Sequence, residues 1–162
     1  MTPFADIVRS PMGWSRLTSV LLMVVFLTAC ARQEEIGAFR TDGCTLFPNR
    51  SLIDESDWCD CCLEHDIAYW KGGTEEDRLA ADEALRLCVL ERTGDEILAG
   101  LMFDGVRLGG SPYFPTWYRW GYGWPLNRGY QALTRAEEMV ADRKLKVFFR
   151  DNPEGPCGQT VP

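Results

Sequence analysis

The chain has 162 residues, 46% of them hydrophobic, which is enough for one domain with a buried core. The formal net charge is −7, and because residues 1–29 carry a net +1, the rest of the chain is near −8. A chain this acidic is a poor nucleic-acid binder, because the phosphates repel it. Bulk charge does not draw it to anionic membranes either.

The N-terminal segment has the pattern of an export signal. Leu17–Ala29 is a mostly apolar run of about 13 residues, too short to span a bilayer, and two arginines precede it. Leu27-Thr28-Ala29-Cys30 resembles the lipobox of bacterial lipoproteins, in which the cysteine is lipidated after cleavage. An ordinary signal peptide or a signal anchor is the alternative. The long stretch before the apolar run leaves open whether translation starts at Met1 or at Met12.

Three parts are therefore expected along the chain. Residues 1–29 form a lipoprotein signal peptide, residues 30–41 a lipidated polar tether, and residues 42–162 the domain. Ala31 follows Cys30, whereas an aspartate there would, by resemblance to known lipoproteins, favour retention in the inner membrane. We expect an exported protein that is lipid-anchored to the bacterial cell envelope, with the outer membrane mildly favoured.

Turn and cap residues predict helices separated by loops. Residues 42–57 are rich in turn formers and read as loop. A first helix is expected over residues 57–71, before Gly72-Gly73, and a second runs from Thr74 as its N-cap to Thr93. Because the Gly-Gly connection is so short, the two helices are expected to be antiparallel neighbours.

The remainder of the chain predicts two further helices around an aromatic segment. A weaker helix is expected over residues 95–108, and a last helix over residues 134–150, opened by Thr134 and Glu137 as a capping box. The aromatic rings between them either form a surface for a membrane interface or pack the core of a small domain. These rings belong to Tyr113, Phe114, Trp117, Tyr118, Trp120, Tyr122 and Trp124.

The seven cysteines are an odd number, which requires an explanation in an exported protein. Lipidation of Cys30 leaves six, enough for three disulfides, although spacing alone does not decide which cysteines pair. A zinc site is the rival interpretation of the cysteines around His65, but an export signal favours an oxidising compartment and therefore disulfides. The six are Cys44, Cys59, Cys61, Cys62, Cys88 and Cys157.

The segment Cys61-Cys62-Leu63-Glu64-His65-Asp66-Ile67-Ala68-Tyr69 contains the single histidine of the chain. On a helix, Cys61, His65 and Tyr69 lie four residues apart on one face. The segment resembles the active-site helix of secreted phospholipase A2, whose pattern is Cys-Cys-x-x-His-Asp-x-Cys-Tyr. One position departs from that pattern, because Ala68 stands where the family has a cysteine.

A second segment carries the same resemblance. Residues 81–88, Ala-Asp-Glu-Ala-Leu-Arg-Leu-Cys, match the partner helix of the family, which reads Cys-Asp-x-x-Ala-Ala-x-Cys. Its first cysteine pairs in the family with the cysteine that Ala68 replaces, and here it is Ala81. Both ends of one disulfide are therefore missing together, while the neighbouring pair is kept.

The resemblance implies an all-α, disulfide-linked fold, with an antiparallel two-helix phospholipase A2-like core and additional C-terminal helices. It also implies which cysteines pair. Cys44 is expected to bond to Cys62, and Cys61 to Cys88. Cys59 and Cys157 are then left for each other.

The resemblance further implies calcium-dependent hydrolysis of the sn-2 ester of glycerophospholipids at a phospholipid membrane. His65 would be the general base, Asp82 its orienting partner, Tyr69 a support for Asp82, and Asp66 a calcium ligand. The structural alternatives are solvated helix carboxylates at Asp66 and Asp82, and core packing of Tyr69. No protein partner is indicated.

The expected calcium loop departs from the common glycine-rich form. Thr41–Pro48 has a single glycine and resembles the Asp-Gly-Cys-x-x-x-Pro loop of the microbial and fungal branch of the family. On that resemblance Asp42 supplies a side-chain oxygen and Gly43 a carbonyl to Ca²⁺. In the alternative, Gly43 is a turn residue that Asp42 caps. A loop unable to bind calcium would leave a catalytically silent lipid- or protein-binding module on the cell envelope.

Overall fold

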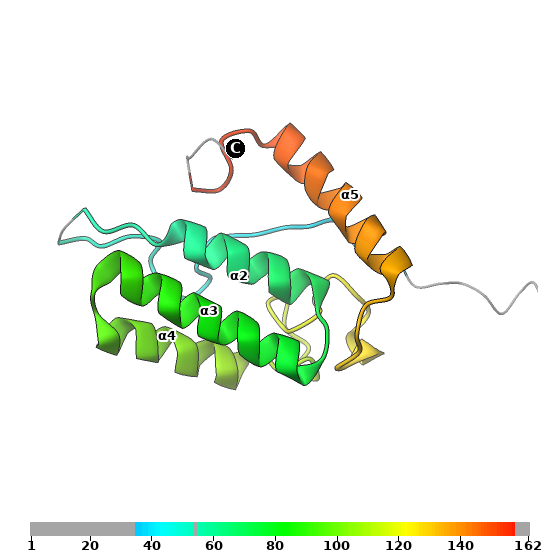
Figure 1. The fold of residues 1–162 in the computed structure, drawn as a ribbon, viewed down its shortest axis with the longest axis horizontal. Coiled ribbons are helices and arrows are strands. Elements are labelled where there is room, and N and C mark those ends of the chain that lie inside the picture. Colours follow the sequence, from blue (N-terminus) through cyan, green and yellow to red (C-terminus); the bar gives the residue numbers. More distant parts are fainter. Residues whose placement is uncertain (1–34, 54, 158–162) are drawn as a thin grey trace, which may run out of the picture. The chain divides into compact units, whose positions relative to one another are not determined.

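Four α-helices form most of the regular structure in the computed structural model, which describes residues 35–53 and 55–157 (Figure 1). Within these residues there is no strand, only an isolated bridge between Arg50 and Asp57. The predicted all-α class is therefore confirmed. The signal peptide and Cys30 lie outside the described residues. The elements are α2 (Cys59–Lys71), α3 (Glu75–Thr93), α4 (Glu96–Gly109), the short 3-10 helix η1 (Leu126–Arg128) and α5 (Arg135–Asp151).

Local sequence explains where α3 begins and ends. The Thr74 side chain accepts from the backbone N–H of Asp77, and the Asp77 carboxylate accepts from the backbone N–H of Thr74. This reciprocal capping satisfies two donors that the first turn leaves free. Gly94 ends the helix in the left-handed conformation (φ 67°), which glycine adopts without the steric penalty of a side chain.

Helix α2 begins two residues later than predicted. The Oδ1 atom of Asp57 accepts from the backbone N–H of Cys59 at 2.9 Å, so Asp57 lies in the turn before the helix. At the other end, Gly72 stops α2 with φ 69°. A side chain at Gly72 would also approach the backbone of Gly121 to 2.9 Å, so this connection requires glycine for two separate reasons.

Helices α2 and α3 lie side by side and run in opposite directions. Three contacts join them in sequence: Cys61 with Cys88, His65 with Asp82, and Tyr69 with Arg78. As the residue number rises along α2, that of its partner falls along α3. The short Gly72–Gly73 connection therefore places His65 beside Asp82, although 17 residues separate them.

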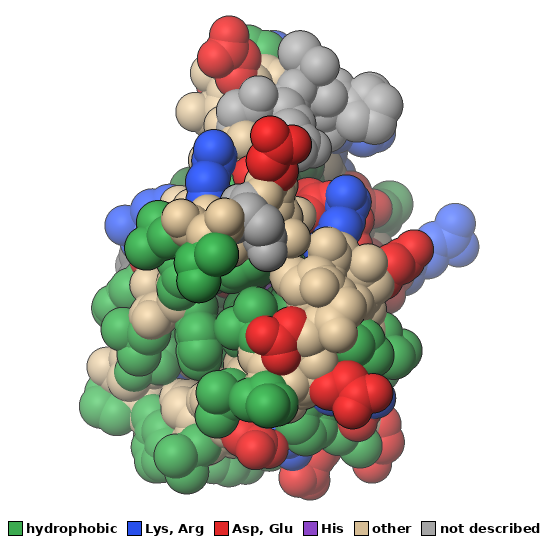
Figure 2. All heavy atoms as spheres, turned by 90° about the vertical axis from the view of Figure 1, so that its left-hand side faces the viewer, with side chains coloured by type: hydrophobic (Ala, Val, Ile, Leu, Met, Phe, Trp, Pro, Cys, Tyr) green, Lys and Arg blue, Asp and Glu red, His purple; other side chains and the backbone are tan. Residues whose placement is uncertain are grey.

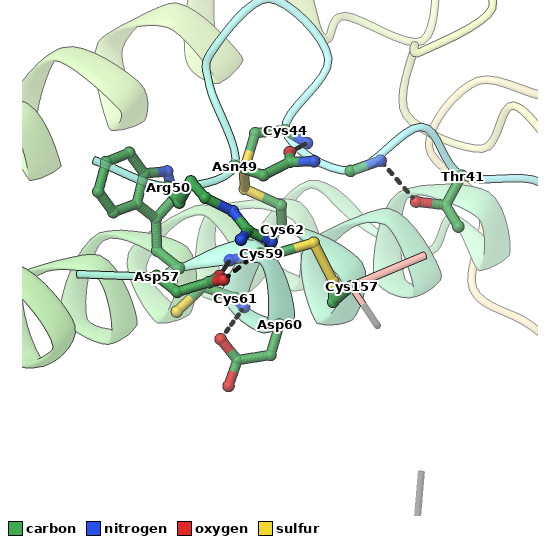
Figure 3. The surroundings of a disulfide bond; sticks show 12 residues. Thr41, Cys44, Asn49, Arg50, Asp57, Cys59, Asp60, Cys61, Cys62 and Cys157 are labelled. Carbon is green, nitrogen blue, oxygen red and sulfur yellow. Dashed lines mark hydrogen bonds and ion pairs between the residues drawn. A yellow bond between two sulfur atoms is a disulfide. The ribbon is translucent and has the colours of Figure 1, made fainter. Parts of the chain in front are cut away.

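The three disulfides are those expected: Cys44–Cys62, Cys59–Cys157 and Cys61–Cys88. Figure 3 shows the first two beside each other near the start of α2, where one holds the loop before the helix and the other holds the C-terminal segment. The bonded cysteines join a core that also contains Trp58, Leu85, Val89 and Met102. All six described cysteines are paired, which removes the thiolates that a zinc site would need.

A second core cluster changes the expected start of the domain. Ile36 and Phe39 are buried (0% and 4% exposed) and pack with Trp70 and Trp124. Lys144 of α5 donates to the carbonyl oxygen of Ile36. The segment from residue 35 onward is thus packed against the helices, whereas the sequence placed it in a polar tether. The two buried side chains, Ile36 and Phe39, hold this segment against the helices, although its otherwise polar composition predicted a tether.

The aromatic segment is partly buried and partly exposed. Trp120 and Trp124 are buried, and their indole N–H groups donate to the carbonyl oxygens of Gly73 (3.0 Å) and Lys71 (2.6 Å). These bonds fix the segment against the connection between α2 and α3. Other rings of the segment remain exposed, namely Tyr113, Phe114 and Trp117.

Hydrophobic side chains also gather on the surface. Figure 2 shows them over much of the face seen from the left-hand side of Figure 1, where α3 joins α4. Exposed apolar residues include Leu46, Leu52 and Ile53 of the loop before α2, and Ile97 and Leu101 of α4. No helix among the described residues is long and apolar enough to cross a membrane.

Candidate functional site

The sequence-predicted pair of His65 and Asp82 forms the centre of the site. The Nε2 atom of His65 lies 2.9 Å from Oδ1 of Asp82. The carboxylate is fully buried and the imidazole is 8% exposed. Helix α2 supplies the histidine and α3 the aspartate, so the pairing depends on how these helices pack.

Asp82 accepts hydrogen bonds at both of its carboxylate oxygens. Tyr69 donates to Oδ1 at 2.8 Å, and Arg107 of α4 donates to Oδ2 at 2.7 Å. Burial alone would raise the pKa of Asp82, but the hydrogen bonds from His65, Arg107 and Tyr69 outweigh it and hold the pKa below its ordinary value of 3.8. Asp82 is therefore a carboxylate at neutral pH.

The charge state of Asp82 decides the tautomer of His65. A carboxylate only accepts hydrogen bonds, so the proton shared with Asp82 belongs to Nε2 of the neutral imidazole. Nδ1 then carries the lone pair, and it has no hydrogen-bond partner among the described residues. A base at this atom is available to water or to a substrate.

Arg78 is a buried cation that ties the site together. Its Nε donates to the Tyr69 hydroxyl at 3.1 Å and lies 3.8 Å from Oδ2 of Asp82. Its other nitrogens donate to the Tyr130 hydroxyl and to two carbonyls near the end of α4. Burial and the nearby Asp82 together raise the pKa of Tyr69, so the phenol keeps its proton and donates it to Asp82.

A cavity of about 120 Å³ lies against this network. Its polar lining residues include Thr45, His65, Asp66 and Tyr69. Most of the remaining wall is apolar, so the cavity suits the hydrocarbon part of a ligand with a polar group beside His65. That apolar wall includes Leu46, Phe47, Leu85, Met102, Val106 and Tyr118.

Asp66 follows His65 on α2 and occupies a different environment from Asp82. Its carboxylate is half-buried, and the Thr41 hydroxyl donates to Oδ2 at 2.6 Å. Burial raises the pKa of Asp66 to about 7; the Thr41 hydrogen bond lowers it, and the charge of Asp42 raises it further. No basic side chain compensates this carboxylate as Arg107 compensates Asp82, within the part of the chain that the structure describes.

The loop before α2 brings Asp42 and Gly43 near Asp66. Gly43 is left-handed (φ 81°), and a side chain there would meet the amide of Asn49 at 2.4 Å. The backbone N–H of Gly43 donates to the Thr41 hydroxyl at 3.1 Å, so Asp42 does not cap it. The Asp42 carboxylate instead accepts from the Thr45 hydroxyl at 3.2 Å.

The donors around this loop fit a calcium ion in chemical type. Two carboxylates, Asp42 and Asp66, repel each other beside a loop whose backbone carbonyls are further hard oxygen donors. A bound cation would attract both carboxylates and so offset the repulsion between them. Within residues 35–53 and 55–157, however, no three His, Cys, Asp or Glu side chains converge as a metal-binding group. Backbone carbonyls would therefore have to supply much of the coordination.

Arg78 and Arg107 are the members of the network that sequence reasoning missed. Arg78 lies among other charged residues of α3, which is the usual pattern of a solvated face, and Arg107 lies near the end of the mostly apolar α4 without a local pattern that marks it. Their roles depend on α4 packing against α3, and no local pattern predicts that contact. The signal that could have found them is the need of a buried Asp82 for cationic partners.

Comparisons with known proteins leave the family open. No protein-family model, no curated protein and no solved structure matches the chain.

Proposed function

We propose that the protein is a phospholipase A2-like carboxylic ester hydrolase that releases the fatty acid from the sn-2 position of glycerophospholipids in a calcium-dependent reaction. The observation that carries this proposal is the buried His65–Asp82 pair beside an apolar-walled cavity. The antiparallel packing of α2 and α3 agrees with the core that the phospholipase A2 resemblance implies.

The reaction needs a base for water, and Nδ1 is the ring nitrogen of His65 that the contact with Asp82 leaves free. It would accept a proton as water attacks the ester carbonyl, and the imidazolium would be stabilised by Asp82. The same proton then passes to the leaving alkoxide as the acyl–oxygen bond breaks. The products are a fatty acid and a lysophospholipid. Tyr69 and Arg107 hold Asp82 throughout.

Asp66, Asp42 and the Gly43 carbonyl would hold the calcium ion. When bound, it would stabilise the negative charge that develops on the ester carbonyl oxygen. Asp66 lines the same cavity as His65, so the cation site and the base face one ligand space.

The same features support a place for the enzyme at a phospholipid membrane. Three disulfides are typical of an oxidising compartment, in agreement with export and with lipid anchoring at Cys30. Exposed apolar side chains suit contact with lipid, among them Leu46, which lines the cavity at His65, and Trp117 of the aromatic segment. We propose the outer membrane as the location.

One observation favours a second candidate, a catalytically silent lipid- or protein-binding module. The described residues offer Asp42 and Asp66 to a cation but no third acidic ligand. A site that binds calcium too weakly would keep the cavity and lose turnover.

Fatty-acid release from mixed phospholipid–detergent micelles by the full chain tests the proposal. We expect release with calcium, none with a chelator, and a loss of at least about a hundredfold in His65→Ala, the range for a general base. Glu64→Ala is the matched control, because Glu64 precedes His65 on α2 and is exposed. A folded chain that releases no fatty acid under any of these conditions would leave the silent module as the better description.

A further inference from the structure

A second cavity lies beside the first and has a different chemistry. Its volume is about 600 Å³, and its lining includes Arg40, Thr116, Trp117, Arg119 and Tyr122 together with Asp42. Thr41 and Asp42 line this cavity, while Gly43, the next residue, lines the cavity at His65. The candidate calcium loop therefore contributes to the lining of both cavities.

Arg119 is a buried cation without a carboxylate partner in the described chain. It is 7% exposed, and its guanidinium donates to the carbonyl oxygens of Trp120, Gly121 and Trp124. These carbonyls explain how Arg119 shapes the loop, but they carry no net charge. Burial lowers the pKa of Arg119, as expected where no anion compensates the charge.

The other arginines that the fold buries wholly or in part do have acidic partners. Arg78 and Arg107 face Asp82 at 3.8 and 2.7 Å, and Arg128 pairs with Glu137 at 2.8 Å. Buried charges are ordinarily paired in this way. An unpaired arginine in the wall of a cavity indicates that the compensating anion comes from outside the chain.

Two further groups favour an oxygen-rich anion. Arg40 adds a second guanidinium to the lining, and the cavity carries a net positive charge even with Asp42 included. The Oγ1 atom of Thr116 is buried and has no hydrogen-bond partner in the described part of the chain. A hydroxyl donor together with two guanidinium groups matches the acceptor oxygens of a phosphate.

We propose that this cavity binds a phosphate group, either the phosphodiester of a phospholipid headgroup or free phosphate, through Arg40, Arg119 and Thr116. The headgroup source rests on the proposed function, because the cavity then takes the polar end of a lipid whose ester lies beside His65. The free-phosphate source does not depend on it.

Calorimetric titration tests this proposal without turnover and without calcium. The full chain carrying His65→Ala, in sugar-headgroup detergent micelles with a chelator, is titrated with inorganic phosphate and separately with glycerophosphocholine. We expect glycerophosphocholine to bind, and Arg40→Gln to weaken that binding roughly tenfold, the effect of losing one charge-assisted contact. Thr116→Val should weaken it less. Asp42→Asn should strengthen it, because a repelling carboxylate is removed.

The control is Arg143→Gln on α5, an exposed arginine that does not line the cavity. Arg40 is preferred to Arg119 for substitution because its side chain is exposed. Its backbone carbonyl, which a substitution keeps, accepts from the Tyr122 hydroxyl. Binding of inorganic phosphate alone would support the anion site and assign it to free phosphate. Binding of neither probe, or equal weakening by Arg143→Gln, would overturn the proposal. Phosphate binding by a chain that never hydrolyses lipid would refute only the proposed function.

Discussion

Arg107 donates to Oδ2 of Asp82 at 2.7 Å, on the side of the carboxylate opposite the oxygen that meets His65. The buried aspartate is thus held from three helices, α2, α3 and α4. This arrangement makes α4 part of the candidate catalytic network, although no residue of α4 was predicted to be in it.

Substitutions at Arg107 distinguish the effect of its charge from the effect of its side-chain volume. Arg107→Met should lower the free energy of unfolding by about 2 kcal/mol, because a hydrogen bond to a charged group is lost and Asp82 stays buried. It should also lower kcat and change KM less, since the orientation of His65 depends on Asp82. Arg107→Lys should recover part of both. Urea unfolding and steady-state kinetics measure the two effects. Arg86→Met is the control, because Arg86 pairs only with half-exposed Glu83, and an equal effect there would contradict a special role for Arg107.

Asp82→Asn should destabilise the fold by about 3 kcal/mol near neutral pH, because it leaves buried cations unpaired. The folded-state pKa of Asp82 lies below 3.8, so its stabilising charge is present above that pH and is lost as the pH falls through the folded pKa. The difference in the free energy of unfolding between the two proteins should therefore be constant above about pH 5 and become smaller in acid. Denaturant unfolding across this range checks the trend, with Asp142→Asn, at a surface pair with Lys71, expected to change little. A difference in the free energy of unfolding that grows in acid would contradict this prediction.

Calcium should raise the melting temperature, and the effect should depend on Asp66. The folded-state pKa of Asp66 is about 7, above 3.8, so its ionisation destabilises the fold as pH rises between these values. Without calcium at about pH 8, Asp66→Asn should thus melt higher than the unchanged protein. With calcium at a hundred times its Kd, the unchanged protein should gain about 2.7 kcal/mol and the variant much less. Equal gains in both would exclude Asp66 as a ligand.

The disulfide Cys59–Cys157 should contribute more stability than Cys44–Cys62. The first closes 98 residues and the second 18. In the chain-entropy description, removing these disulfides lowers the free energy of unfolding by about 4.7 and about 3 kcal/mol, respectively. Guanidinium unfolding of the two double Cys→Ala variants measures the order. The reverse order would mean that packing around Cys44 outweighs loop entropy.

Two glycines of one region should respond in opposite directions to alanine. At Gly110 a side chain would come within 2.6 Å of the Tyr69 hydroxyl, so Gly110→Ala should cost about 1–3 kcal/mol by overpacking and disturb Asp82 through Tyr69. Gly100, inside α4, has open space around it, and Gly100→Ala should stabilise by about 0.5–1 kcal/mol. Thermal unfolding of both variants distinguishes them, and a neutral Gly110→Ala would show that Tyr69 can move away without loss.

Much of the helical structure could be read from short-range signals. Thr74 and Gly94 delimit α3 as predicted, and Thr134 caps α5 with Glu137. Such signals act within one helical turn, so they are visible in the sequence. The start of α2 was predicted two residues too early, because the Asp57 side chain accepts from the N–H of Cys59 and therefore precedes the helix. The sequence alone did not show that Asp57 takes this place.

The sequence by itself determined the helical class, and helix spacing with one short connection placed His65, Tyr69 and Asp82 on two joined helices, since both signals are local. The pairing of the cysteines came from the family resemblance, because their spacing alone left it open. Only the tertiary structure decided that Arg78 and Arg107 compensate Asp82, that Ile36 and Phe39 belong to the core, and that Arg119 lies unpaired in a cavity wall. These depend on packing between segments far apart in the chain, where a charged or apolar residue has the same local pattern whether it is buried or exposed.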